Sequence, residues 1–131
     1  MPDFMKIAFE EAEAAAVRGE VPIGAALVSD KGELLARTGN RTEELCDPTA
    51  HAEMLVIREA AKKRHSPRLS DCDLYVTLEP CAMCAATISF ARLRRVIFAA
   101  YDPKGGGVEH GPRFFGQSTC HHKPEVVGGV E

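Results

Sequence analysis

Two short motifs constrain this chain more than any other feature, because together they supply the ligands of a metal site. They are His51-Ala52-Glu53 and Pro80-Cys81-Ala82-Met83-Cys84. One imidazole and two thiolates are three ligands that zinc favours, and a catalytic zinc site keeps its fourth position open for water or substrate. The carboxylate of Glu53 is then left over as a proton carrier. A fold that suits this chain must therefore bring the two motifs to one place.

A Cys-x-x-Cys pair has two other common uses, which explain less of the sequence. In a redox pair, the two cysteines would leave the histidine and the glutamate of the motifs without a role. A structural four-cysteine site would need Cys46 and Cys72, whose spacings match no familiar zinc module. A catalytic zinc site explains all four motif residues, so we favour it over the other two.

The size and composition predict one globular domain covering residues 1–131. Of these 131 residues, 45% are apolar and 27% are charged, which is ordinary for a soluble protein with its own core. No stretch approaches the length of a membrane span, and the N-terminus does not resemble a secretory signal. We therefore expect a cytoplasmic protein with no membrane partner. Five cysteines, an odd number, do not indicate a disulfide framework in such a protein.

Acidic and basic side chains are unevenly divided along the chain. The formal net charge of −3 argues mildly against a dedicated nucleic-acid-binding protein. Residues 1–60 hold 12 acidic and 6 basic side chains, whereas residues 61–131 hold 7 acidic and 10 basic ones. A surface that binds nucleic acid would therefore come mostly from the second half. Its candidate cations, which could equally form an ordinary solvated face, are Arg92, Arg94, Arg95, Lys104, Arg113 and Lys123.

Hydrophobic periodicity and turn residues predict alternating helices and strands. Asp3 caps a first helix, which Arg18-Gly19 ends. The further elements are strands at 24–28 and 33–38, a helix at 50–63, a strand at 74–78, a helix from Cys81, a strand at 95–100 and a short strand around 126–127. The strands on either side of the helix from Cys81 are joined through it, which implies parallel pairing. This pattern predicts an α/β fold, a three-layer α/β/α sandwich around a mixed sheet of about five strands.

The predicted elements place both motifs at the N-termini of helices. Cys81 and Cys84 stand at i and i+3 of a first turn, so both sulfurs face one side, and the helix dipole favours their thiolates. His51 and Glu53 are two residues apart and would point to nearly opposite sides of a regular helix, so they serve one centre only at its tip. We therefore expect the metal between two helix N-termini at the ends of two strands, a usual place for an α/β active site.

Other candidate residues have plainer interpretations. The glycines at 105–107 lack the lysine and hydroxyl residues of a phosphate loop, and we expect them in a flexible surface loop. Pro22-Ile23-Gly24 is either an ordinary turn or one wall of a substrate pocket. His65 and His110 are expected to be exposed to solvent, while His121-His122 could touch a phosphate or bind a metal weakly.

Several strings around the motifs carry a family resemblance over nearly the whole chain. They are Glu20-Val21-Pro22-Ile23-Gly24-Ala25, Gly39-Asn40-Arg41, Asp47-Pro48-Thr49-Ala50, Leu74-Tyr75-Val76-Thr77-Leu78-Glu79-Pro80 and Ile88-Ser89-Phe90-Ala91-Arg92. The motif order H-x-E…P-C-x-x-C is the signature of zinc-dependent nucleobase deaminases. With the flanking strings, the sequence resembles the cytidine deaminase-like superfamily and, within it, the bacterial tRNA-specific adenosine deaminases. Guanine and cytosine deaminases of the same fold share several of these strings.

The resemblance implies a cytidine deaminase-like fold and a zinc-dependent hydrolysis. His51, Cys81 and Cys84 would bind one zinc ion per subunit, which lowers the pKa of a bound water. Glu53 would carry protons from that water to the base and to the departing amine. No organic cofactor is implied.

The resemblance also implies residues that bind the substrate. Asn40 would hydrogen-bond the base from the side, and the backbone N–H of Ala52 would orient the exocyclic group. Pro22, Ile23 and Gly24 would form one wall of the pocket. For Asn40 alone, the plainer interpretation is an ordinary loop asparagine in a left-handed turn.

The implied substrate is the wobble adenosine of a tRNA anticodon loop, which would become inosine. Such a base must be unstacked in a loop before it can enter a pocket. The resemblance further implies a homodimer, in which each site is completed by the partner. Members of the family usually continue beyond Val126-Val127 into a C-terminal helix with aromatic and arginine residues, whereas the present sequence ends at Glu131.

Two other functions are compatible with the sequence. The first is the same chemistry on a free base such as guanine or cytosine, which predicts turnover of a small molecule and no salt-sensitive RNA binding. The second is a non-catalytic zinc module that binds RNA or a partner protein. Glu53 argues against this module, because a protein that needs only the metal has no use for a carboxylate there.

Overall fold

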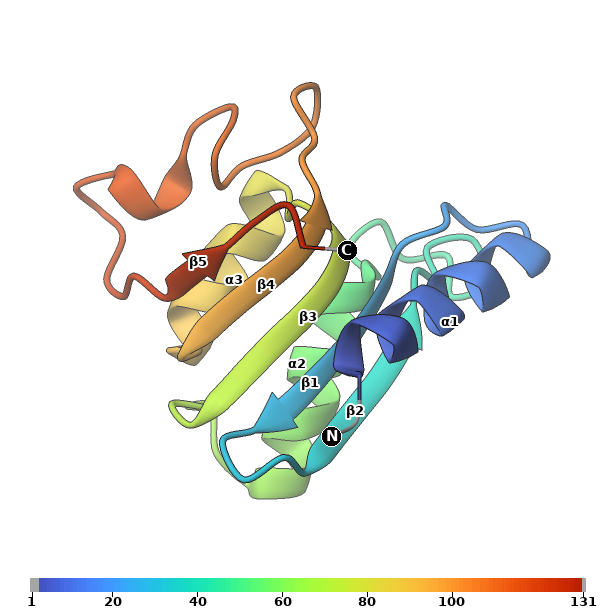
Figure 1. Cartoon of the computed structure of the whole chain (residues 1–131), viewed down its shortest axis with the longest axis horizontal. Coiled ribbons are helices and arrows are strands. Elements are labelled where there is room, and N and C mark those ends of the chain that lie inside the picture. The colour runs from blue at the N-terminus through green and yellow to red at the C-terminus, as the bar shows by residue number, and fades with distance from the viewer. Residues whose placement is uncertain (1–2, 131) are drawn as a thin grey trace.

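A mixed five-stranded sheet forms the centre of the molecule (Figure 1). The computed structural model describes residues 3–130. The strands are β1 (Gly24–Ser29), β2 (Leu34–Gly39), β3 (Cys72–Leu78), β4 (Arg95–Ala100) and β5 (Glu125–Val127), and their order across the sheet is β2-β1-β3-β4-β5. β1 pairs antiparallel with β2 and β3, whereas β3 with β4 and β4 with β5 are parallel. The predicted parallel pairing of β3 and β4 is thus confirmed.

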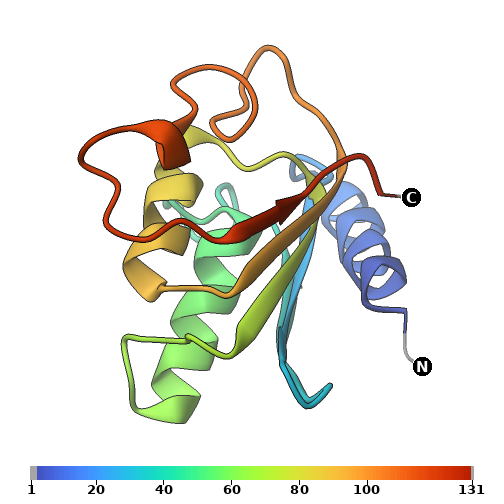
Figure 2. The same ribbon diagram turned by 60° about the vertical axis from the view of Figure 1, so that its left-hand side comes forward.

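Helices cover both faces of the sheet and give three layers (Figure 2). α1 (Phe4–Val17) lies on one face, and α2 (Ala52–Arg64) and α3 (Ala82–Ala91) lie on the other. Large side chains from the sheet and from α2 and α3 are fully buried between them, among them Leu27, Val56, Leu74, Ile88 and Phe98. Each such side chain contributes about 2 kcal/mol when it is buried. The predicted α/β/α sandwich is confirmed, and none of the helices within residues 3–130 is long and apolar enough to cross a membrane.

α1 packs closely on β1, because Gly24 has no side chain. A Cβ atom at Gly24 would overlap the carbonyl of Ala8 and the amide of Ala12. Any side chain at this position would therefore push α1 away from the sheet. Asp3 caps the helix as predicted, since its Oδ1 accepts the N–H of Lys6 at 3.1 Å.

Both helices on the opposite face begin slightly later than predicted. α2 begins at Ala52 rather than at residue 50, and α3 begins at Ala82 rather than at Cys81. His51 and Cys81 are instead the N-caps, with extended backbone at φ −75°, ψ 151° and φ −72°, ψ 174°. Before α2, the carboxylate of Asp47 holds a turn that delays the helix, because it accepts both the N–H and the hydroxyl of Thr49.

Strand ends and one short helix also differ from the sequence predictions. β3 begins at Cys72, two residues before the predicted start at 74, because its first residues still pair with the end of β1. A 3-10 turn, η1 (Phe114–Gly116), lies in the segment before β5 and contacts α3. β4 has the predicted bounds, Arg95–Ala100.

Candidate metal centre and active site

The candidate metal ligands come together where α2 and α3 begin. His51 is the N-cap of α2, Cys81 is the N-cap of α3, and Cys84 lies in the first turn of α3. Nδ1 of His51 lies 3.6 Å from Sγ of Cys81 and 3.5 Å from Sγ of Cys84. Within residues 3–130, these three form the one group of histidine, cysteine and acidic side chains whose ligand atoms all lie within 4.8 Å of one another.

The spacing of the three donor atoms fits a tetrahedral zinc ion. With Zn–S and Zn–N bonds of about 2.3 and 2.1 Å, a sulfur and a nitrogen ligand of a tetrahedral centre stand about 3.6 Å apart. The observed separations of 3.6 and 3.5 Å agree with this value. In the described part of the chain, Cys46 and Cys72 do not join the group, so the four-cysteine structural site is not formed. Three ligands leave one position open, which suits a reactive centre.

The two cysteines of the centre hold a proton unequally. The neighbouring Cys84 lowers the pKa of Cys81 to about 5. The interaction with Cys81, together with burial, raises the pKa of Cys84. Both residues stand at the N-terminus of α3, where the helix dipole favours negative charge. A thiolate is therefore already favoured at Cys81, and a bound cation would favour one at both positions.

Glu53 lies in the first turn of α2, directly beside the metal ligands. The residue is only 4% exposed. No group within residues 3–130 hydrogen-bonds to its buried Oε1, although buried polar atoms normally have a partner. Burial raises the pKa of Glu53 to about 7. A carboxyl group with this pKa can both accept and release a proton near neutral pH, as a catalytic acid–base residue must.

Asn40 follows β2 and connects this strand to the start of α2. Its Oδ1 accepts the backbone N–H of Ala52 at 2.8 Å, and the residue is 4% exposed. The N–H of Ala52 is thus engaged by Asn40 in this structure. Because Oδ1 accepts, Nδ2 is the side-chain atom of Asn40 that can donate to a substrate.

The residues predicted to form a pocket wall lie at the same edge of the sheet as Asn40. β1 runs antiparallel to β2 and β3, so the start of β1 meets the ends of those strands. Ile23, just before β1, accepts the N–H of Asn40 at 3.0 Å through its carbonyl. Ile23 is half-buried and Pro22 is exposed. Gly24, in contrast, meets α1 on the face away from α2 and α3.

A second buried carboxylate, Glu79, lies just before the metal-binding turn, and no local sequence pattern predicts its role. It accepts the backbone N–H groups of Asp102, Val108, Glu109 and His110, and also contacts Nδ1 of His110, at 2.8–3.1 Å. Burial alone would raise the pKa of Glu79, but these partners hold it below the ordinary value of 4.5. Glu79 therefore holds the loop after β4 next to the segment that carries Pro80 and Cys81.

His110 differs from the sequence prediction for the same reason. Its side chain is only 33% exposed, because the ring contacts the buried Glu79 at 2.8 Å. The expectation that His110 is simply exposed is therefore wrong. The two residues are 31 positions apart, and no local sequence pattern marks such a pair.

Known proteins share this sequence and this fold. The family described as the cytidine and deoxycytidylate deaminase zinc-binding region matches residues 2–100, which include His51, Glu53, Cys81 and Cys84. The tRNA-specific adenosine deaminase of Agrobacterium fabrum is 61% identical over 127 residues, which cover 97% of this chain and 83% of that protein. The chain belongs to the tRNA-specific adenosine deaminases.

Two solved structures place the deaminase fold in context. One comes from a study of A-to-I editing by tRNA:A34 deaminases at the wobble position of transfer RNA; it has a TM-score of 0.94 and 61% identity, with 96% of each chain covered. The other, a guanine deaminase from Bacillus subtilis, has a TM-score of 0.72 and 40% identity, with 75% of this chain and 62% of that chain covered. The sheet, the helices and the zinc-binding region of this chain are therefore those of a deaminase.

Two of the cations expected on a nucleic-acid surface of this deaminase are paired within the chain. Arg94 donates to both carboxylate oxygens of Asp73, at 2.9 and 2.6 Å. Arg95 lies 3.2 Å from the carboxylate of Glu125. Because a carboxylate neutralises each guanidinium, neither is well placed to bind a phosphate.

The ion pairs between residues 3–130 include none of the other candidate cations. Lys104, Arg113 and Lys123 are exposed, and Arg92 donates to the carbonyl of His121 at 3.1 Å. Arg113 and Lys123 also line a surface cavity of about 380 Å³ beside β5. Among the described residues that line this cavity there is no metal ligand, so it is distinct from the candidate active site.

Proposed function

We propose that this deaminase converts adenosine to inosine by hydrolysis at the wobble position of a tRNA anticodon loop. The observation that carries the proposal is Glu53, a buried carboxyl group that follows the metal ligand His51 and has no hydrogen-bond partner for Oε1 within residues 3–130. Such a group beside a three-ligand metal centre suits proton transfer, and relatives named tRNA-specific adenosine deaminases indicate the substrate. We assign residues 1–131 to a single deaminase domain.

We assign one zinc ion per subunit to His51, Cys81 and Cys84. When bound, zinc would act as a Lewis acid that lowers the pKa of a water molecule, so that this water can lose a proton and attack carbon near neutral pH. Cys81 favours its thiolate even before a cation is present, because its pKa is lowered to about 5. Cys81 therefore offers its sulfur in the state that a metal requires, and a bound cation would favour the thiolate of Cys84 as well.

Glu53 carries the protons of the reaction. It takes a proton from the attacking water and delivers it to the ring nitrogen next to C6 of adenine. It then moves the proton of the new hydroxyl on C6 to the amino group, so ammonia leaves and C6 keeps a carbonyl oxygen. Its pKa of about 7 permits both the uptake and the release of a proton at neutral pH.

Asn40 recognises the base through its Nδ2 group. The N–H of Ala52 holds Oδ1 at 2.8 Å, and this hydrogen bond sets the plane of the amide. Ile23 and Pro22 form a wall beside Asn40, while Gly24 keeps the backbone of this wall close to α1. A purine is thereby bounded by a polar group on one side and by apolar atoms on another.

The substrate base must be unstacked, because a base inside a helix cannot reach a metal centre between two helix N-termini. The exposed Lys104, Arg113 and Lys123 are suited to the phosphates around such a base.

We also infer a homodimer that uses the outer face of α3, where Ala82 is exposed and Phe90 is 68% exposed. Water is the only co-reactant of the hydrolysis, so no organic cofactor is needed. Because the proposed substrate is tRNA, we assign the protein to the cytoplasm.

A second candidate substrate is a free purine base. The structure of a guanine deaminase shares the fold at 40% identity, so the same centre is compatible with attack on a free base. A free base needs no phosphate contacts, so its turnover would be almost independent of salt, whereas RNA binding would weaken steeply as salt rises.

The test offers the zinc-loaded protein an anticodon stem-loop with a wobble adenosine and, separately, guanine, cytosine and adenine. Inosine in the RNA, formed more slowly as salt is raised, is the expected result. If only a free base released ammonia, the substrate would be that base rather than tRNA, and the proposed mechanism of deamination would stand. Zinc bound without turnover of any of the four would overturn the assignment as an enzyme and favour a non-catalytic zinc module.

A further inference from the structure

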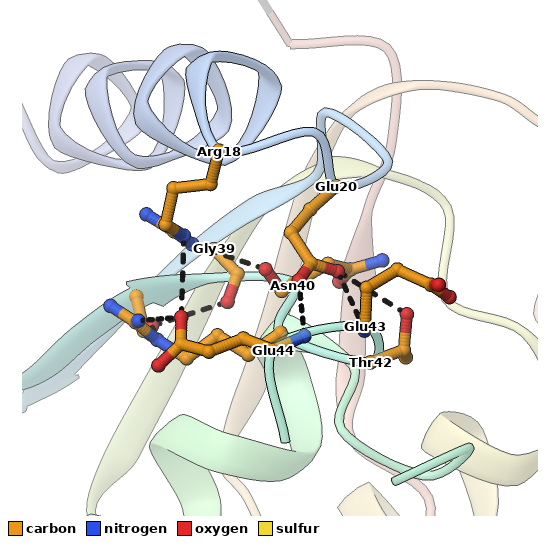
Figure 3. A network of polar contacts seen from close by, with 9 residues as sticks. Arg18, Glu20, Gly39, Asn40, Thr42, Glu43 and Glu44 are labelled. Carbon is orange, nitrogen blue, oxygen red and sulfur yellow. Dashed lines mark hydrogen bonds and ion pairs between the residues drawn. The ribbon is translucent and has the colours of Figure 1, made fainter. Parts of the chain in front are cut away.

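A buried carboxylate near the substrate wall has no role in the chemistry described above. Glu20 lies between α1 and β1 and is only 6% exposed. Its carboxylate accepts the hydroxyl of Thr42 at 3.3 Å and the backbone N–H groups of Glu43 and Glu44 at 3.1 and 2.8 Å (Figure 3). Glu20 therefore holds the turn that directly follows Asn40 and Arg41.

A second set of contacts joins this turn back to Asn40. Nη2 of Arg18 donates to the backbone carbonyl of Asn40 at 3.1 Å, and Nε of Arg18 lies 3.7 Å from the carboxylate of Glu44 (Figure 3). Arg41 also contacts Glu44, at 2.7 Å. Arg18 and Glu20 both lie near the end of α1. Arg18 contacts the carbonyl of Asn40 directly, whereas Glu20 binds the turn that follows Asn40.

Asn40 is consequently fixed at three of its polar atoms. Its N–H is held by the carbonyl of Ile23 at 3.0 Å, its carbonyl by Arg18 at 3.1 Å, and its Oδ1 by the N–H of Ala52 at 2.8 Å. The remaining polar group is Nδ2, the donor that the proposed function assigns to the substrate base. These three contacts fix the position of Nδ2, so the side chain of Asn40 is not free to rotate.

We propose that Glu20 is a positioning residue for the deamination, which fixes the turn at 42–44 so that Asn40 presents Nδ2 to the base. This inference rests on the proposed function, because it assigns Glu20 an effect on the same reaction through Asn40. Glu20 itself touches neither the metal ligands nor Glu53 in the contacts of residues 3–130.

The chemistry of the cluster explains why a carboxylate is needed at this position. Burial alone would raise the pKa of Glu20, but the backbone donors and Thr42, together with the charge of Arg18, hold it below its ordinary value. In all three of these hydrogen bonds, Glu20 is the acceptor. A glutamine would turn one acceptor into an N–H₂ donor facing those groups, and the turn would have to move. A displacement of this kind reaches Asn40 because only Arg41 separates it from Thr42.

A purely structural role for Glu20 predicts a different outcome from a positioning role. A purely structural role would lower only the folded fraction, so the rate per folded molecule would stay unchanged whether or not Asn40 is present. A positioning effect would require the amide of Asn40, so it would vanish when that amide is removed. The two roles are therefore separated by a double-mutant cycle on the rate rather than by a single variant.

The experiment measures kcat/KM for the wobble-adenosine stem-loop with the zinc-loaded wild type, Glu20→Gln, Asn40→Ala and the double variant, each corrected for its folded fraction. We expect Glu20→Gln to lower kcat/KM about tenfold in the wild type and less than about twofold in Asn40→Ala. The matched control is Glu43→Gln, an exposed carboxylate on the same turn, which should leave kcat/KM unchanged. An equal loss in both backgrounds, or no loss in either, would overturn the positioning role.

A second variant keeps the test decisive if Glu20→Gln folds poorly. Arg18→Met retains the aliphatic stem of an exposed residue but loses the bond to the carbonyl of Asn40. Its effect on kcat/KM should also vanish in the Asn40→Ala background, and an undiminished effect there would overturn the proposal. A wild type that is inactive on the RNA would instead reject the proposed function, so the two failures are distinguishable.

Discussion

Glu53 and Glu79 are two buried glutamates that flank the metal-binding residues and yet have opposite surroundings. Glu53 follows His51 and is 4% exposed, while Glu79 precedes Pro80 and Cys81 and is 3% exposed. Glu79 accepts four backbone N–H groups and contacts the ring of His110, whereas nothing within residues 3–130 donates to Oε1 of Glu53. Burial alone would raise both pKa values, but only Glu79 has donors enough to reverse that effect.

The difference between these carboxylates shows that burial does not decide what an acidic residue does. A carboxylate with donors on both oxygens is a fixed anion, and it organises the backbone around it. A carboxyl group that is buried with an oxygen left without a donor has a raised pKa and can exchange protons near neutral pH. We therefore assign the chemistry to Glu53 and the architecture of the loop at 101–111 to Glu79.

The largest effect is expected when the metal centre beside Glu53 is destroyed. His51→Ala should lose zinc and all measurable deamination, and its free energy of unfolding should fall, by up to about 10 kcal/mol if zinc contributes as it does in small zinc domains. Zinc content, inosine formation and thermal unfolding measure the three effects. His121→Ala, which removes an exposed histidine, is the control and should resemble the wild type. A metal-free but fully active His51→Ala would contradict the account of the centre.

Glu53→Gln should separate chemistry from stability. Because it removes the proton carrier, we expect kcat/KM to fall about 1000-fold, within the range for general acid–base catalysis. Zinc binding and the thermal midpoint should stay near the wild-type values, since the carboxylate accepts no hydrogen bond at Oε1 from residues 3–130. Single-turnover inosine formation and zinc content check this prediction, and unchanged turnover would remove Glu53 from the mechanism.

Glu79→Gln should show the reverse pattern. An amide cannot accept all the donors that surround Glu79, so the free energy of unfolding should fall by about 2 kcal/mol. The rate per folded, zinc-loaded molecule should fall far less than in Glu53→Gln. Urea unfolding and the same rate assay measure these effects, with Glu109→Gln, an exposed carboxylate in the same loop, as the control. A stable but inactive Glu79→Gln would show that the two roles have been assigned the wrong way round.

The smallest effect concerns the pH dependence of that stability. The folded-state pKa of Glu79 lies below 4.5, so its contribution to stability is complete above pH 4.5 and is lost as the pH falls through the folded-state pKa. The difference in unfolding free energy between the wild type and Glu79→Gln should therefore be large at neutral pH and shrink below pH 4.5. Denaturant unfolding across this pH range measures it, and a difference that is independent of pH would contradict the role of the charge.

Local sequence patterns predict the fold and the metal centre well. The bounds of β4 and the capping of α1 by Asp3 agree with the sequence, because apolar periodicity and cap chemistry are local properties. The position of His51 at the tip of α2 was also predictable, since two residues two apart can serve one centre only there. These features depend on residues that are close together in the chain.

The surroundings of the centre depend on contacts that no local pattern records. Glu79 meets His110 across 31 residues, and Arg94 meets Asp73 across 21. A glycine-rich segment gives no sign that its N–H groups converge on one carboxylate, so His110 was expected in solvent. The count of basic residues likewise does not show which of them, such as Arg94, are already paired.

The source of the oxygen in the product tests most directly whether Glu53 serves a hydrolytic deamination. The zinc-loaded wild type, Glu53→Gln and Glu79→Gln are each given the wobble-adenosine stem-loop in water labelled with heavy oxygen, and the inosine is analysed by mass spectrometry. We expect heavy oxygen at C6 of the inosine from the wild type and Glu79→Gln, and almost no inosine from Glu53→Gln. Labelled inosine formed equally fast by Glu53→Gln, or none from the wild type, would contradict the proposed hydrolysis.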